Sequence, residues 1–411
     1  MHNADAQNPD VTIDKAGDDI RDWVANHGRF AGSIGELMRR LGARCAPAGL
    51  PLSRISLLIR TLHPMVAAAG YVWHATEGRL EEFTRDHQSQ SSEAYLSSPI
   101  RLVFEGSSGV RRRLADADCP NDFSILDDLR SEGMTDYIVL PVPFSDGRTY
   151  AASFATTVAG GFSDAQIGRL TALMPTLALV VEILTVRTIA QTIASTYIGR
   201  SAGRRVLDGA IYRGVNETID AVIWISDLRG FTVLSDTQAP PVVLGILNDH
   251  FERLSDAISA QGGEVLKFMG DSLLAMFPVA SLGGAEAAIC AALTSARAAR
   301  ASMDLRNVER ARHRLPPIRF GIGLHRGEVL YGNIGAPDRL DFTVIGPAVN
   351  YAARIEQMCR TLDRRVLVSA AIAEQAGEQL TSLGFQALRG VREPQEIFAL
   401  ADRPPPGEPA G

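Results

Sequence analysis

The sequence predicts an α+β protein of two domains, whose C-terminal half opens with the β-α-β-β-α-β order of a ferredoxin-like sandwich. The chain has 411 residues, 46% of them hydrophobic, which is enough to fill two cores. Strand-like and helical runs mix in both halves, and a Gly- and Arg-containing connector separates the halves. We therefore expect a disordered leader, an α+β domain, a helical linker, a second α+β domain and a disordered tail over residues 1–18, 19–187, 188–219, 220–402 and 403–411.

The N-terminal half mixes two kinds of periodicity. Ile34–Leu41 and Leu52–Leu62 are expected to be helices, because their apolar residues fit a helical spacing. Three runs with alternating or β-branched residues are expected to be strands: Ala69–His74, Asp136–Pro143 and Tyr150–Thr157. The order and size of these elements resemble a GAF-type sensor. We therefore expect a regulatory domain that responds to a small-molecule or protein signal, which the sequence does not identify.

One apolar run, Leu170–Val186, approaches the length needed to cross a membrane. It contains Pro175 and Glu182, which are unfavourable inside a lipid bilayer. We therefore expect a buried or dimer-packed helix and no membrane span. The longer segment Gln166–Ala194 could pair across a dimer and transmit a signal to the C-terminal half.

The C-terminal half contains clearer element signals. A strand at Ala221–Ile225 precedes a helix at Pro241–Ala260, which starts with proline and stops at two glycines. A hairpin is expected about Gly270-Asp271, and a second hairpin about Arg326-Gly327. The remaining expected elements, in order, are the hairpin strands Glu264–Met269 and Ser272–Phe277, the helix Gly284–Met303, the hairpin strands Arg319–Leu324 and Glu328–Ile334, the strand Phe342–Ile345 and the helix Pro347–Leu362.

Charge and cysteine usage exclude several classes of protein. The net charge is −6 and the pI about 5.8, whereas a nucleic-acid binder normally has a basic face. The four cysteines are far apart and form neither a disulfide framework nor a zinc-site spacing. The polar, acidic N-terminus lacks the pattern of a signal peptide. These features predict a cytoplasmic protein that does not bind nucleic acid.

Two carboxylates are predicted to meet at one end of the second domain. Asp227 ends the first strand, before a small turn at 228–232, and Asp271 lies at the tip of the first hairpin. Mg²⁺ takes one or two carboxylates together with substrate phosphates, so this pair suits a nucleoside triphosphate. The glycine turn can also direct backbone N–H groups at phosphates. Taken singly, each aspartate would be an ordinary turn residue.

A third cluster follows the strand at Phe342–Ile345. Asn350 and Arg354 are four residues apart on the expected helix and therefore share one of its faces. The planar fork of arginine suits phosphate oxygens, and an asparagine can orient a sugar ring through hydrogen bonds. Alone, this spacing would be explained more often by a helix-start asparagine and a solvated arginine.

Several such patterns occur together, in order, within one stretch of the chain. Their joint occurrence favours functional residues over ordinary turn and surface residues. The segments ISDLRGFTVLSD, GGEVLKFMGDSLLAMF, RFGIGLHRGEVLYGNIG and RLDFTVIGPAVNYAARIE closely resemble the signature blocks of class III nucleotidyl cyclases. The resemblance covers Asp220 to about Ala401. It implies a homodimer in which two catalytic domains pair head to tail, with the nucleotide in the groove between them.

The resemblance also implies roles for the residues that match its motifs. Asp227 and Asp271 would hold two Mg²⁺ or Mn²⁺ ions per site, with the Leu228 carbonyl as a further ligand. The partner subunit would supply Asn350 to position the ribose and Arg354 to stabilise charge on the α-phosphate. The turn residues that would contact the substrate are Gly230, Phe231 and Thr232.

Lys267 and Thr343 match the pair that selects the base in this family, and they favour adenine. Threonine in place of the commoner aspartate resembles the IIIb subgroup. The expected reaction is attack of the ribose 3′-oxygen of ATP on the α-phosphorus, giving cyclic AMP and pyrophosphate, a phosphorus–oxygen lyase activity. A guanylate cyclase and a catalytically inactive nucleotide-binding module are the alternatives. Guanylate cyclases of this family typically carry an acidic residue and a small polar residue or cysteine at these positions.

Other polar residues receive different interpretations. Arg392 is the expected contact of the triphosphate, with Arg389 as the alternative. Arg229 is interpreted as structural and His325 as a packed histidine at a strand end. His63 and His74 support no cofactor, because core or surface histidines are more frequent than heme or metal ligands.

Overall fold

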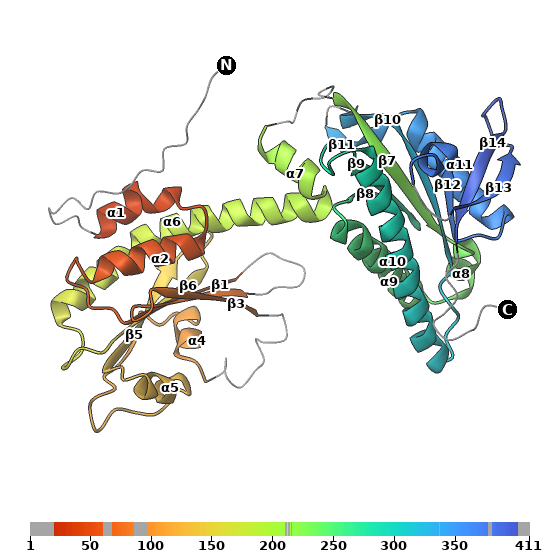
Figure 1. The fold of residues 1–411 in the computed structure, drawn as a ribbon. Coiled ribbons are helices and arrows are strands. Elements are labelled where there is room, and N and C mark those ends of the chain that lie inside the picture. Colours follow the sequence, from red (N-terminus) through yellow and green to blue (C-terminus); the bar gives the residue numbers. More distant parts are fainter. Residues whose placement is uncertain are drawn as a thin grey trace, which may run out of the picture. The chain divides into compact units, whose positions relative to one another are not determined.

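The protein is described here from a computed structural model, which describes residues 20–60, 68–85, 97–209, 212, 214, 216–336, 338–376 and 380–401 (Figure 1). The chain forms two compact units, residues 1–192 and 193–411. The expected leader at 1–18, the tail at 403–411 and His63 lie outside the described residues.

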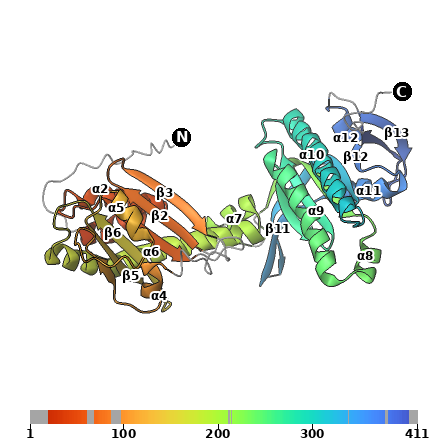
Figure 2. The same cartoon turned by 90° about the horizontal axis from the view of Figure 1, so that it is seen from below.

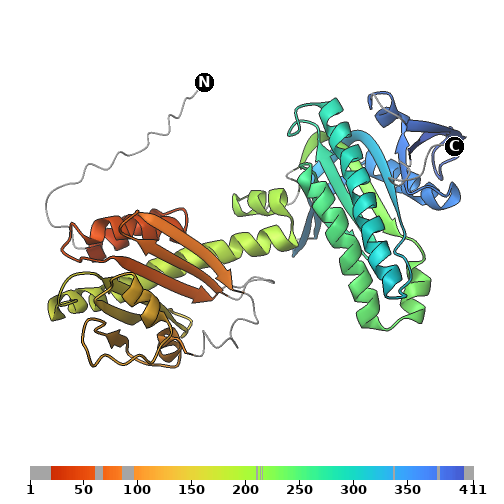
Figure 3. The same ribbon diagram turned by 60° about the horizontal axis from the view of Figure 1, so that its bottom comes forward.

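The N-terminal unit is an antiparallel sheet covered on both faces. Its six strands follow the order β3-β2-β1-β6-β5-β4. One face carries α1, α2 and α6, and the other carries α4 and α5 (Figures 1 and 3). The elements, in order, are α1 Ile20–Asn26, η1 Gly28–Phe30, α2 Ile34–Cys45, β1 Arg54–Arg60, β2 Ala68–His74, β3 Arg79–Arg85, α4 Pro99–Phe104, β4 Val110–Arg112, α5 Ile125–Ser131, β5 Asp136–Pro143, β6 Thr149–Thr156 and α6 Asp164–Tyr197.

The helix expected at Leu52–Leu62 is wrong, because the structure places β1 there. Ile55, Leu57 and Ile59 are buried in alternation, which is the period of a strand. β1 pairs with β2 on one side and with β6 on the other. The apolar residues of this segment fit both the helical period and the strand period, and the pairing with β2 and β6 selects the strand.

Two polar contacts fix α6 to the sheet of the N-terminal unit. Asp136 is fully buried and accepts hydrogen bonds from the Arg111 guanidinium and from the backbone N–H of Phe162, just before α6. Within α6, Glu182 accepts hydrogen bonds from the backbone and the hydroxyl of Ser145. The start and the middle of α6 are therefore both held by the sheet.

Among the described residues, α6 is the one helix long and apolar enough to cross a membrane, judged by length and composition. Of its most apolar 18-residue window, 44% is buried, and Leu170, Leu177 and Val181 lie in the core of the N-terminal unit. The prediction that this segment packs against protein agrees with that buried face.

The C-terminal unit is built on a ferredoxin-like core. The sheet order is β13-β14-β12-β10-β7-β9-β8, with β11 paired to β10, and the four adjacent strands β10-β7-β9-β8 come from the unit β7-α9-β8-β9-α10-β10. The elements are α7 Arg200–Leu207, β7 Asn216–Leu228, α8 Phe231–Thr237, α9 Pro240–Ala260, β8 Glu264–Met269, β9 Ser272–Pro278, α10 Ala285–Arg312, β10 Phe320–Ala336, β11 Arg339–Ile345, α11 Pro347–Thr361, β12 Val366–Ser369, α12 Ala370–Ala373, β13 Leu380–Gln386 and β14 Gln395–Leu400. The predicted α+β class is confirmed.

Successive residues of β7 supply two cores. Val222 and Trp224 face α9 and α10, which lie side by side across one face of the sheet (Figure 2). Ala221, Ile223 and Ile225 face α7 and α11 on the other side. The apolar run that predicted the strand is therefore buried on both faces.

The second hairpin, expected about Arg326-Gly327, is wrong. β10 is one continuous strand that pairs with β7 from Phe320 opposite Leu228 to Gly332 opposite Asn216. Arg326 forms an ion pair with Asp220 on β7. A Cβ on Gly327 would lie 3.0 Å from the Ala348 side chain of α11, so this glycine provides close packing within a strand.

We predict that His250 makes the stability of the protein depend on pH. This ring is fully buried between Phe251 and Phe320, neither ring nitrogen has a partner among the described residues, and burial lowers its pKa to about 4. The unfolded chain therefore binds the extra proton between pH 6.5 and 4, so stability is complete above pH 6.5 and is lost as pH falls.

Replacing His250 with leucine should reduce this dependence by up to about 1.4 kcal/mol per pH unit, measured by urea unfolding at several pH values. His313→Gln, at the exposed end of α10, is the matched control and should leave the slope unchanged. Equal slopes for wild type and His250→Leu would contradict the prediction.

Candidate active site

The carboxylate pair lies where β7 ends. After Asp227 and Leu228 the chain turns into α8 through Gly230, whose φ of 75° is in the left-handed region that favours glycine. β9 pairs with β7, with Leu273 opposite Ser226, so the turn between β8 and β9 lies beside the end of β7. Asp227 and Asp271, predicted to meet, are brought together by this pairing.

The two aspartates influence one another's charge. Burial and the negative charge of Asp227 raise the pKa of Asp271 to about 6. A third carboxyl group, Glu356 of α11, has its pKa raised to about 7 by burial and by Asp227, an effect that Arg229 opposes. The three carboxylates carry like charges in a half-buried space, so a bound cation would stabilise them.

The donor set fits a divalent metal that also binds the substrate. Among the described residues, no group of three His, Cys, Asp or Glu side chains is arranged to hold a metal ion. Asp227 and Asp271 thus offer two carboxylates and leave coordination positions for other oxygens. This set suits Mg²⁺ or Mn²⁺ bound with phosphates better than a structural zinc site.

Two neighbours of this pair were not predicted from the sequence. The Ser272 hydroxyl donates a 2.6 Å hydrogen bond to Asp227 Oδ1 and so fixes its orientation. Glu356 approaches β10 at Gly321, where an added Cβ would lie 2.6 Å from its Oε1. The signal for Ser272 was its position directly after Asp271. Glu356 carried no signal apart from its place two residues after Arg354.

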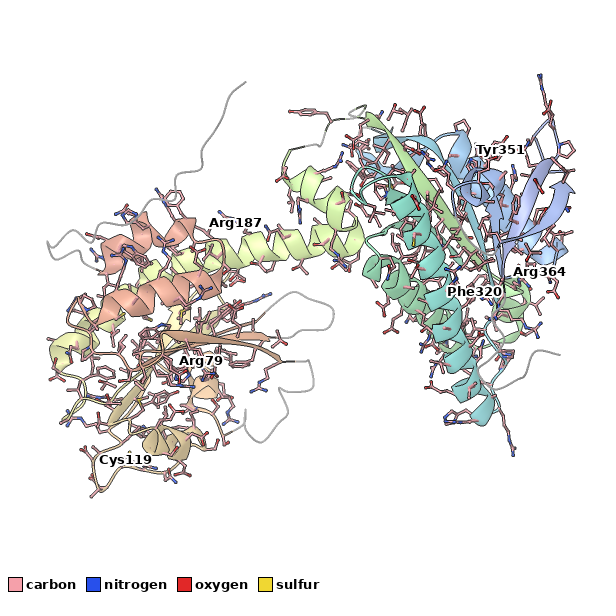
Figure 4. The ribbon with its side chains drawn as sticks, viewed as in Figure 1. Arg79, Cys119, Arg187, Phe320, Tyr351 and Arg364 are labelled. Carbon is pink, nitrogen blue, oxygen red and sulfur yellow. The ribbon has the colours of Figure 1, made fainter. Side chains whose placement is uncertain are left out.

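Arg229 is structural, as predicted. Its guanidinium donates to the backbone carbonyls of Cys359, at 2.7 Å, and of Arg364, and forms an ion pair with Asp363. These partners lie at and just after the end of α11, near the labelled Arg364 (Figure 4). Arg229 thus ties the turn after Asp227 to the C-terminal end of α11.

His325 is packed, but it does not lie at a strand end. It is in the interior of β10, where its ring stacks on Tyr351 of α11 with the centroids 4.9 Å apart. Its Nδ1 is 2.9 Å from Ser369 Oγ, and burial lowers its pKa to about 4. His325 is therefore neutral at pH 7 and serves to pack α11 on the sheet.

The residues predicted to read the base lie on β8 and β11, two strands that contact one another but do not pair in the sheet. Lys267 projects from β8, and its Nζ forms a 2.8 Å ion pair with Asp341 of β11. Thr343 follows two residues later on β11, hence on the same face, and is 8% exposed. β8 thus carries a partly exposed ammonium group and β11 a hydroxyl group on a buried side chain, and both groups can form hydrogen bonds.

α11 presents Asn350 and Arg354 on its outer side. The helix packs on the sheet through Ala348, Ala352, Ile355 and Cys359. It approaches β10 so closely that a Cβ on Gly323 would lie 2.4 Å from the Ala352 carbonyl. Asn350 is exposed, and Arg354 contacts only the side chain of Gln357, at 3.2 Å, among the described residues.

The predicted site residues thus form three groups: Asp227 to Thr232 with Asp271, Lys267 with Thr343, and Asn350 with Arg354. No hydrogen bond or ion pair joins one group to another within the described part of the chain. Arg389 and Arg392 are exposed between β13 and β14 and have no such link either.

Comparisons with known proteins find matches to the same stretch. Residues 215–401 match the family described as the adenylate and guanylate cyclase catalytic domain. An adenylate cyclase of Anabaena cylindrica is 34% identical over 159 residues, 39% of this chain and 31% of the relative. Adenylate cyclase 1 of Rhizobium meliloti is 32% identical over 179 residues, 43% of this chain and 26% of the relative. The matched stretch thus spans about a third or less of these relatives.

A solved structure, that of the adenylyl cyclase CyaB from P. aeruginosa, is 28% identical to this chain. The match covers 46% of this chain and 96% of that one, with a TM-score of 0.42.

We predict that divalent metal binding weakens as the pH falls below about 6. Asp271 must lose its proton before it can bind a cation, and its pKa is raised to about 6. The Mn²⁺ affinity, measured by calorimetric titration between pH 5 and 8, should fall roughly tenfold per pH unit below 6 and level off above it. Asp271→Asn is the control and should bind weakly at every pH. A constant wild-type affinity between pH 5 and 7 would sink the prediction.

Proposed function

Residues 215–401 belong to the adenylate and guanylate cyclase catalytic domain family, and from this premise we propose that the protein is an adenylate cyclase. It converts ATP into 3′,5′-cyclic AMP and pyrophosphate at sites shared by two copies of the chain. The observation that carries the choice of ATP is the presence of Lys267 on β8 and Thr343 on β11, two strands that contact one another. The relatives from Anabaena cylindrica and Rhizobium meliloti, both named adenylate cyclases, support the same choice.

The shared site is supported by the lack of direct hydrogen bonds between the three groups. Among the described residues of one copy, no hydrogen bond or ion pair links the carboxylate pair to Lys267 and Thr343 or to Asn350 and Arg354. Two copies arranged head to tail would bring the carboxylates of one to the base-reading and phosphate-binding groups of the other. Twofold symmetry then produces two equivalent sites.

The carboxylates would hold the metals, and the other residues would act on the nucleotide. Asp227, Asp271 and the Leu228 carbonyl would bind two Mg²⁺ or Mn²⁺ ions, with Ser272 keeping Asp227 oriented. When bound, the metals lower the pKa of the ribose 3′-hydroxyl and neutralise the triphosphate. The hydroxyl group would lose its proton to solvent water, the 3′-oxygen would bond to the α-phosphorus, and the bond from the α-phosphorus to the leaving pyrophosphate would break.

The partner copy supplies the groups that orient and stabilise the substrate. Lys267 and Thr343 form hydrogen bonds with the edge of adenine. Asn350 positions the ribose, and Arg354 donates to the α-phosphate oxygens as negative charge develops there. The start of α8, Gly230 to Thr232, and Arg392 are assigned to the triphosphate.

The N-terminal domain is proposed to regulate this reaction, and α7 offers a physical route within the C-terminal unit. Ala202 of α7 packs in the same cluster as Leu266 and Phe342, which directly precede Lys267 and Thr343. α7 also borders a cavity of about 1270 Å³ that has Lys267 on its wall. A displacement of α7 would therefore disturb the base-reading residues first.

We predict cyclic AMP formation by the purified full-length protein with ATP and Mn²⁺ or Mg²⁺, and little cyclic GMP from GTP. Asp271→Asn should lose at least about a hundredfold in kcat, because one metal ligand is removed. Cyclic GMP as the main product would favour a guanylate cyclase. Nucleotide binding without product under every condition would favour an inactive module.

Mixing two inactive variants tests the shared site. Asp271→Asn and Asn350→Ala each damage both sites of their own dimer, but a mixed dimer keeps one intact site. Mixing equal amounts should restore roughly a quarter of wild-type activity. Absence of restoration, with subunit exchange verified by a tag on one variant, would contradict a site built from two copies.

We predict that Gly203→Ala impairs the use of ATP by displacing α7. The added Cβ would lie 2.7 Å from the Ala194 backbone, so α7 must move. The value of kcat/KM for ATP should fall about tenfold, mainly through KM, while the Mn²⁺ affinity stays unchanged. Gly245→Ala, in the helix α9 with no neighbour within 4 Å, is the matched control. Equal effects of the two substitutions would argue against the route through α7.

A further inference from the structure

We infer that Asp341 is a positioning residue for base selection, because its carboxylate holds Lys267 where the ammonium group donates to N1 of adenine. The inference rests on the proposed function, since it takes Lys267 as a residue that reads the base. It assigns a role to a side chain outside the pair of Lys267 and Thr343. The observation that carries it is the 2.8 Å ion pair between Lys267 Nζ and Asp341 Oδ2.

Lys267 needs an anchor if it is to act on one atom of a base. A lysine carries its charge at the end of a flexible four-carbon chain, so the ammonium group of an unanchored lysine samples many positions. The side chain of Lys267 is 35% exposed, and Asp341 is its one ion-pair partner within the described part of the chain. Asp341 therefore sets the direction of this ammonium group.

The strands β8 and β11 direct the two side chains at one another. The pairing of β8 with β9 shifts its register between Val265 and Lys267, as at a β-bulge, which re-aims the side chain that follows. On β11, Asp341 lies opposite Ile334 of β10 in a regular register. The backbone thus turns Lys267 toward a carboxylate whose own position is fixed by the sheet.

The ion pair contributes little to the stability of the fold. The side chain of Asp341 is 63% exposed, and a pair at such exposure is weakened by water and by salt. Both residues line the cavity of about 1270 Å³ beside α7. A base fits in a space of that size, because sites for small molecules occupy about 300–1000 Å³. The main effect of Asp341 is therefore on the position of Lys267 at this cavity.

The anchored ammonium group distinguishes the two purines because it is a donor only. It has three N–H groups, of which one is directed at Asp341, so two remain for a base. N1 of adenine is an acceptor and is complementary to this group. N1 of guanine carries a hydrogen, so two donors would face one another and remain unpaired, which a binding site rejects strongly.

The same anchor opposes the binding of guanine in a second way. Guanine has an acceptor, O6, next to N1, and an unanchored Lys267 would be free to turn its ammonium group to that atom. While Asp341 holds Lys267, this turn breaks a charge-assisted hydrogen bond. Loss of the carboxylate should therefore weaken the use of ATP and relax the discrimination against GTP.

A direct contact between Asp341 and guanine is the competing interpretation, since a carboxylate accepts hydrogen bonds from N1–H and N2–H of that base. Such a contact would take both carboxylate oxygens, whereas the hydrogen bond from Lys267 already occupies Oδ2. The ion pair favours the positioning role. The two interpretations predict opposite effects of Asp341→Asn on the use of GTP relative to ATP.

Steady-state kinetics of purified full-length variants test this role. Asp341→Asn keeps the shape of the side chain and removes its charge, so KM for ATP should rise about tenfold while kcat changes less than about threefold. Asp341→Glu keeps the charge and should recover most of the loss. Asp304→Asn is the matched control, because Asp304 is a comparably exposed carboxylate that pairs with Arg365, and it should leave KM unchanged.

Further readouts separate positioning from a merely structural role. Asp341→Asn should leave the melting temperature unchanged and raise the ratio of kcat/KM for GTP to that for ATP about tenfold. Added to Lys267→Met, it should change KM for ATP by less than about twofold, because Asp341 acts through Lys267. Additive effects of the two substitutions, a lower KM for ATP in Asp341→Asn, or a fall in the use of GTP relative to ATP would overturn the inference.

Calorimetric binding of ATP and GTP distinguishes a failure of this inference from a failure of the proposed function. A wild type that forms cyclic AMP, with an unchanged KM in Asp341→Asn, keeps the activity and refutes the role of Asp341. A wild type that forms no cyclic product but binds ATP at least about tenfold more tightly than GTP, with this preference lost in Asp341→Asn, refutes the activity and supports the role of Asp341. A wild type that prefers GTP in both assays refutes both.

Discussion

The C-terminal unit depends on the continuous pairing of β7 with β10 from Asn216 to Leu228. This ladder fixes the end of β7, with Asp227, relative to β10, with which β11 pairs and on which α11 packs. Glycines in β10 let α11 lie directly on the ladder, and the closeness of α11 places Glu356 beside the aspartates. A break in the ladder would therefore separate the carboxylates from the helix that supports them.

The negative charges of the carboxylates destabilise this arrangement of strands and helix. Three carboxyl groups in a half-buried space repel one another, and the raised pKa values of Asp271 and Glu356 express that repulsion. The protein tolerates it because the ladder and Arg229 hold the elements in place. A bound cation would relieve the repulsion between the carboxylates. The free energy of that repulsion would therefore favour the binding of metal.

Much of this organisation could be predicted from local patterns. The strand before Asp227, the hairpin about Gly270 and the helix of Asn350 were predicted because turn residues and periodicity agree there. The turn at Arg326-Gly327 was not real, because only the packing of Ala348 shows why the glycine is needed. Leu52–Leu62 was misassigned because its strand conformation depends on pairing with β2 and with the distant β6, which the local pattern does not show. Ser272 and Glu356 acquire their positions from tertiary contacts, which no local pattern encodes.

Arg229 connects parts of the molecule that belong to different sites in the proposed dimer. It leaves the turn next to Asp227 and ends on the carbonyls at the far end of α11. The same helix carries Asn350 and Arg354 toward the second site. Binding of a nucleotide at one site would thus shift α11 and change the affinity of the other site, so the two nucleotides would bind cooperatively. Positive cooperativity would indicate that the first nucleotide draws α11 toward the second site. Negative cooperativity would indicate that it draws α11 away.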